Sequence, residues 1–230
     1  MRRWGLVVTL FYVVVILVLV VPGTIVFGFF PHVKTLWQLR DVLKNTYAFW
    51  GVWLVFGILI LGQVLLLWLS VDTTRGRLKP RTHILISATT TALLLALLTS
   101  AVLFSLTVVV WGDDADQKVT SFEMLAGFLV PWLLWGILFY RLTRDADDAV
   151  TRAISWLMRG SVLELLIAVP SHVIVRRRDD CCAPIVTGYG IAAGNAIMLL
   201  SFGPSVLLLY KKRIEARSLR TAVPGSPSAG

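Results

Sequence analysis

The stretch ILISATTTALLLALLTSAVLFSLTVVVW, residues 84–111, decides the fold of this chain. It carries no charged side chain over twenty-eight consecutive residues. A helix that crosses the ~30 Å hydrocarbon layer of a bilayer needs ~20 consecutive apolar residues, because a helix rises about 1.5 Å per residue. We therefore predict that residues 84–111 form a transmembrane helix.

The rest of the chain repeats this pattern. Of its 230 residues, 57% are apolar and 15% are charged, whereas soluble domains have roughly 45–50% and about 25%. The composition excludes a disordered chain, a disulfide scaffold and an ordinary soluble enzyme. We predict an all-α polytopic transmembrane helical bundle, a single domain over residues 1–210, with six helices at 5–28, 48–70, 84–111, 124–142, 153–175 and 185–210.

Two segments outside these helices are long enough to deserve a prediction. In the connection 29–47, the apolar residues Val33, Leu36, Trp37 and Leu43 lie near helical spacing with charges between them. This pattern favours an amphipathic helix at the membrane interface, with an irregular loop as the alternative. The tail 211–230 is first basic and then rich in Pro, Gly and Ser, so it is expected to be disordered.

The distribution of Lys and Arg predicts the orientation. If the N-terminus is cytoplasmic and six helices alternate, fourteen cations lie inside and seven outside, with Arg176, Arg177 and Arg178 the discordant group. The positive-inside rule then favours both termini in the cytoplasm. The net charge of +9 is explained by insertion and by attraction to anionic lipid on that face, so we expect the bilayer as a partner and no nucleic acid.

Glu164 is the residue that orientation does not explain. It stands at the centre of the predicted helix 153–175, ~16 Å from either end. A carboxyl group at that depth must be neutral, paired or facing an aqueous cavity, and intramembrane ionisable groups are functional candidates. The alternative is a neutral, structural Glu that hydrogen-bonds across the bundle.

The polar neighbours of Glu164 in the sequence suggest possible partners. Arg159 lies five residues away, ~140° around the helix, so a direct ion pair is not expected and its side chain should extend to the cytoplasmic surface. Asn195 and Gln63 are the amides expected to be buried in other helices. Either could bind Glu164, or could simply join helices by hydrogen bonds.

A cluster of possible metal ligands follows at the outer end of the same helix: His172, Asp179, Asp180, Cys181 and Cys182. The adjacent cysteines lack C-x₂₋₄-C spacing and no second ligand pair exists in the chain, so we predict no metal and no cofactor. A disulfide between neighbouring cysteines would be strained, because their Cα atoms are only ~3.8 Å apart.

Gly190 and Gly194 form a G-x-x-x-G motif in the last predicted helix. Small residues at this spacing let a second helix approach closely. We expect the motif to serve helix packing, either within the bundle or between copies or partner chains, in preference to a substrate site.

The segments LELLIAVPSHVIVRRRDDCCAP and GYGIAAGNAIMLLSFGP together resemble a stretch of uncharacterised multi-pass membrane proteins of bacteria. The resemblance implies a location in the bacterial inner membrane and no known activity. Two functions remain open: a small transporter or channel component with Glu164 as a protonatable mid-membrane group, or a non-enzymatic scaffold or assembly partner. An enzyme or metal site at the outer rim of the last two helices is a third.

Overall fold

The computed structural model describes residues 7, 10–11, 13–15, 35–48, 50–72, 80–115, 121–143, 149–178, 180 and 183–201. All elements within these ranges are helices: α3 (Leu36–Ala48), α4 (Trp50–Asp72), α5 (Pro80–Trp111), the short 3₁₀ helix η2 (Gly112–Asp114), α7 (Ser121–Thr143), α8 (Ala149–Arg177) and a last helix at Ala183–Ser201. The predicted all-α class is confirmed. We refer to the last of these elements as the 183–201 helix.

Four of these helices are long and apolar enough to cross a membrane: Ile84–Trp111, Phe122–Thr143, Thr151–Arg177 and Ala183–Ser201. The first three match predicted segments within a few residues at both ends, and the fourth begins two residues before the predicted helix 185–210. The predicted segment 48–70 is also helical, as the 23-residue α4. The predicted helix 5–28, the end of the predicted helix 185–210 and the tail 211–230 lie largely or wholly outside the described residues.

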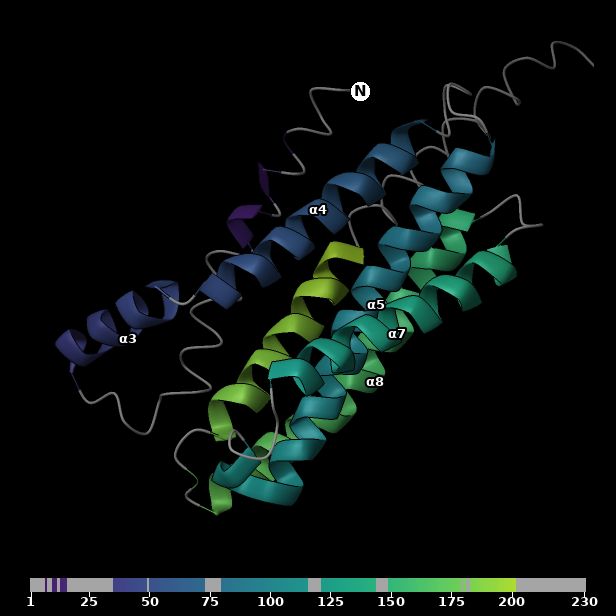
Figure 1. The fold of residues 1–230 in the computed structure, drawn as a ribbon. Coiled ribbons are helices and arrows are strands. Elements are labelled where there is room, and N and C mark those ends of the chain that lie inside the picture. Colours follow the sequence, from purple (N-terminus) through teal and green to yellow (C-terminus); the bar gives the residue numbers. More distant parts are fainter. Residues whose placement is uncertain are drawn as a thin grey trace, which may run out of the picture.

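The long helices lie side by side and run in alternating directions, as the sequence colours of Figure 1 show. α5 lies in the middle and contacts α4, α7 and α8. The 183–201 helix runs antiparallel to α8. The C-terminal ends of α5 and α8 therefore lie at the same end of the bundle, which we call the Arg178 end after the residue that follows α8.

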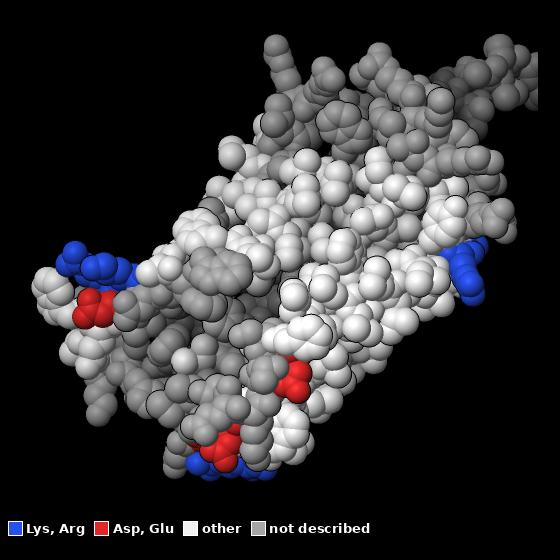
Figure 2. All heavy atoms as spheres, in the orientation of Figure 1, with Lys and Arg blue, Asp and Glu red and all other residues white. Residues whose placement is uncertain are grey.

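The outside of the bundle has the surface expected of a membrane protein. Between Glu123 and Tyr140 of α7 the exposed side chains are large and apolar, and they include Leu125, Leu129, Leu133 and Ile137. Figure 2 shows that the described charged side chains on this face gather at α3 and near the ends of the bundle, with an uncharged surface between them. Such a band fits the hydrocarbon layer.

The predicted helix in the connection 29–47 is confirmed as α3, whose interfacial placement stays a prediction. Thr35 and Gln38 cap its start reciprocally: the Thr35 backbone N–H donates to Gln38 Oε1 at 3.1 Å, and the Gln38 N–H donates to Thr35 Oγ1 at 3.4 Å. Trp37 is 73% exposed, and the Arg40 guanidinium carbon lies 5.7 Å from its ring centroid.

α7 contains Pro131 in its interior, and α5 compensates for it. Proline lacks an N–H, so the carbonyl four residues earlier, on Gly127, loses its helical hydrogen bond. Ser100 Oγ of α5 lies 3.0 Å from that carbonyl oxygen and 2.8 Å from the carbonyl oxygen of Ala96. The hydroxyl proton, shared between the two acceptors, thus joins α5 to α7.

Candidate functional site: a buried carboxyl between α8 and the 183–201 helix

Glu164 lies deep inside the bundle. It is thirteen residues from each end of Thr151–Arg177, a distance of about 20 Å along the helix. Its side chain is only 1% exposed. The carboxyl group therefore does not extend toward either membrane surface, and it lies on the face of α8 that packs against the 183–201 helix.

Two glycines of the 183–201 helix make room for this carboxyl group. A methyl group on Gly194 would overlap Glu164 Oε2 and would come within 2.9 Å of its Cδ and 3.1 Å of Leu165 Cγ. A methyl group on Gly190 would stand 3.3 Å from Glu164 Oε1 and 3.7 Å from Ala168 Cβ. The predicted G-x-x-x-G motif thus packs within the bundle, where it forms a notch that the Glu164 carboxyl fills.

α5 contributes a hydroxyl group to the same place. Ser105 Oγ lies 3.1 Å from the point where a Gly190 Cβ would stand, and Ser105 is fully buried. Most other buried hydroxyls in these helices bond the carbonyl four residues earlier, among them Thr91, Ser161 and Ser201. Ser105 makes no such bond, so its hydroxyl is available to the notch.

The notch lacks a countercharge and a hydrogen-bond partner in the part of the chain that is described. Neither carboxyl oxygen of Glu164 forms a hydrogen bond with another described residue. The hydroxyl oxygen of Ser105 likewise forms none. Residues 84–111 of α5 and the 183–201 helix contain no Asp, Glu, Lys or Arg. A carboxyl group held without a cation in such surroundings favours its neutral, protonated form.

The structure separates Glu164 from most of its expected partners. Arg159 is exposed on another face of α8, in line with the expected absence of an ion pair. Asn195 is also exposed, so its expected burial beside Glu164 is wrong: it follows Gly194 by one residue, about 100° farther around the helix. Gln63 of α4 is 1% exposed and makes no hydrogen bond with a described residue.

His172 lies farther along the same buried face of α8, toward the Arg178 end. Its Nδ1 is 2.8 Å from Thr187 Oγ1 on the 183–201 helix, and both side chains are buried. This hydrogen bond joins the two helices two turns beyond Glu164. The sequence singled out His172, whereas Thr187 and Ser105 carried no signal that distinguished them from other hydroxyls.

The expected cluster of metal ligands is only partly described. Asp179, Cys181 and Cys182 lie outside the described residues, and no group of three His, Cys, Asp or Glu side chains fit for a metal ion occurs in the remainder. Asp180 faces Gly112, the residue with φ +60° that follows α5, and a Gly112 Cβ would stand 3.4 Å from Asp180 Oδ2. Next to it, Arg178 Nη1 donates to the carbonyl of Val109.

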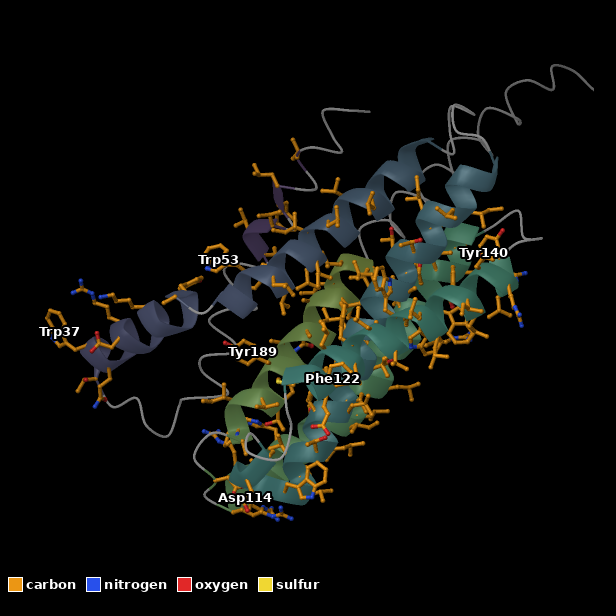
Figure 3. The ribbon with its side chains drawn as sticks, in the orientation of Figure 1. Trp37, Trp53, Asp114, Phe122, Tyr140 and Tyr189 are labelled. Carbon is orange, nitrogen blue, oxygen red and sulfur yellow. The ribbon has the colours of Figure 1, made fainter. Side chains whose placement is uncertain are left out.

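Figure 3 places the site along the bundle. Asp114 marks the Arg178 end and Tyr140 the opposite end, while Tyr189 lies on the 183–201 helix one residue before the glycine that faces Ser105. The site therefore belongs to the interior of the bundle between the two ends. Its chemistry is limited to what one carboxyl and neighbouring hydroxyl and imidazole groups can do, which is to bind and pass on a proton.

The four apolar spanning helices define the class: an integral membrane protein built as a helical bundle. No protein-family model matches the chain, and no similar protein is found among the curated proteins or the solved structures. The bacterial inner-membrane location implied by the resemblance therefore stays a prediction.

Proposed function

We propose that this protein is a small proton-translocating component of the bacterial inner membrane, a transporter or channel subunit in which Glu164 takes up and releases the proton. The observation that carries the proposal is the burial of a single carboxyl group at the centre of α8 with no described cation or hydrogen-bond partner. Ionisable groups at this depth are costly, and function is the usual reason for their retention.

Two features favour transport over a purely structural Glu. A structural carboxyl group is expected to hydrogen-bond across the bundle, and Glu164 has no such bond with a described residue. The glycine notch also accommodates a charged or protonatable group where alanine would leave no room. Conversely, the glycines contact Glu164, so they are not the free surface that the scaffold hypothesis assigned to association.

The test is proton flux into liposomes that contain the purified protein and a trapped pH-sensitive dye, driven by a pH gradient. Glu164→Gln keeps the size of the side chain but cannot ionise, so we expect normal folded yield and loss of flux. Glu164→Asp keeps the acid and should retain part of the flux. Flux in Glu164→Gln equal to that of the unmodified protein, or none above empty liposomes in the unmodified protein, would contradict the proposal.

A further inference from the structure

The two halves of the bundle on either side of Glu164 differ in character. We infer that the proton reaches Glu164 from the Arg178 end only, along Ser105, Thr187 and His172, and that packed leucines close the opposite half. This inference rests on the proposed function and adds the route and the residues that position the proton. The route follows from the side chains that line the interface between α8, α5 and the 183–201 helix.

The half toward the Arg178 end is lined by small and polar side chains from Glu164 to His172, and beyond His172 by a small apolar cluster of Val108, Ala115, Val175 and Ala183. Because the two helices are antiparallel, Gly190 faces Ala168 and Glu164 Oε1, and Thr187 faces His172 one turn farther on. Ala168 is fully buried between these two levels. Small side chains on both walls lower the steric cost of admitting water, and a water molecule there would find the carboxyl, hydroxyl and imidazole groups as partners.

Ser105 stands between Glu164 and the His172–Thr187 pair. Its Oγ and Glu164 Oε1 both approach Gly190, at 3.1 and 3.3 Å from the Cβ position. Its hydroxyl is not tied to its own helix. A hydroxyl group can accept one proton and donate another, so Ser105 is suited to pass a proton between a water molecule and the carboxyl.

The opposite half is packed with large apolar side chains. Leu94, Leu95 and Leu98 of α5 belong to one buried cluster with Leu157 of α8 and Leu200 of the last helix. The glycines of this half face leucine: a Gly160 Cβ would stand 3.1 Å from Leu95 Cδ2 and 3.2 Å from Leu98 Cδ1. A Gly62 Cβ would stand 3.0 Å from Leu94 Cδ2.

The closed side also holds buried polar groups, among them Ser161, Gln63, Ser87 and Thr90. Ser161, the nearest hydroxyl on the same face of α8, donates to the carbonyl of Leu157 at 2.9 Å. Gln63 lies next to Gly62, at the level of Leu94. Besides Glu164, the described ionisable residues of α8 are His172 and the arginines at 152, 159, 176 and 177, and the 183–201 helix adds Tyr189. Arg178 and Asp180 follow α8 at the Arg178 end.

Infrared spectroscopy of the full-length protein in lipid tests the route without requiring flux. The C=O stretching band of protonated Glu164 is identified by its loss in Glu164→Gln, and the rate at which the band shifts in D₂O reports proton access. We expect Ser105→Ala and His172→Phe to slow this exchange by about tenfold or more. Thr187→Val provides a second test of the same step if His172→Phe lowers the folded yield.

Matched controls lie on the closed side. Ser161→Ala and Gln63→Leu should exchange at the unmodified rate. The inference is overturned if Gln63→Leu slows exchange as much as Ser105→Ala, if Ser105→Ala and His172→Phe both exchange normally, or if no band is lost in Glu164→Gln. Slowed exchange in the two route variants, together with absent flux in the unmodified protein, would uphold the route and reject the transport function.

Discussion

The position of the Glu164 carboxyl explains why a glycine stands at position 194. The carboxyl group occupies the space that a side chain at Gly194 would take, so the glycine is required by a specific contact and not by backbone conformation. The sequence indicated both residues but not their contact, because the angular position of each around its helix is set by packing. The 183–201 helix is apolar on most faces, so no polar stripe shows which face is buried.

The same argument explains the failed expectation for Asn195 and the missed Ser105. A polar residue in an apolar helix is expected to be buried, yet Asn195 is exposed while its neighbour Gly194 faces Glu164. Ser105 looks like any other serine in α5. What distinguishes it is that its unbonded hydroxyl faces Gly190 beside the Glu164 carboxyl, and only the three-dimensional arrangement reveals this.

The contact with Glu164 predicts a specific coupling. Gly194→Ala should lower the free energy of unfolding in detergent by about 1–3 kcal/mol, because the added methyl group forces the carboxyl and Leu165 to move. In a Glu164→Ala background the same change should cost clearly less, as a double-mutant cycle would measure. The control is Gly136→Ala, where the nearest atom is Ala92 Cβ at 3.8 Å. Equal costs in both backgrounds would disprove the contact.

At the scale of elements, helix positions were predictable because length and apolarity determine which segments can cross a bilayer. The helices observed at α5, α7 and α8 begin and end within four residues of the predicted boundaries. Their mutual arrangement was not predictable. Pro131 offers an example, because its presence predicts a missing backbone hydrogen bond in α7. The hydroxyl that bonds to the free Gly127 carbonyl comes from Ser100, twenty-seven residues earlier, and the sequence does not reveal this partner.

This compensation can be tested by a pair of substitutions. Ser100→Ala should destabilise the protein by about 1 kcal/mol, because the Gly127 carbonyl would remain unpaired in an apolar environment. Pro131→Ala restores an N–H that can bond this carbonyl within α7. In that background Ser100→Ala should therefore cost less, as unfolding curves of the four variants would show. A cost unaffected by Pro131→Ala would mean that the shared bond to Ala96 carries the effect of Ser100.

At the scale of the whole molecule, the two halves of the bundle on either side of Glu164 are lined by different side chains. The bundle is therefore asymmetric along the membrane normal. The larger apolar cluster of the described residues occupies one side of Glu164, where the hydroxyls of Ser161 and Ser201 bond to their own helices. The His172–Thr187 pair occupies the other side, followed by a smaller cluster that includes Val108 and Val175. If proton access is one-sided, the orientation of the bundle decides which compartment supplies the proton. The positive-inside count predicts that the Arg178 end lies outside, although Arg176, Arg177 and Arg178 belong to this end.

The two native cysteines provide the test of orientation, because the chain contains no others. In the sequence, Cys181 and Cys182 stand between Asp180 and Ala183, two described residues at the Arg178 end. A membrane-impermeant maleimide should label them in right-side-out vesicles after mild reduction, and should fail to label them in inverted vesicles until detergent is added. The double substitution Cys181→Ser and Cys182→Ser should abolish the signal. Labelling only in inverted vesicles would place the Arg178 end in the cytoplasm, and the three arginines would then outweigh the count over the rest of the chain.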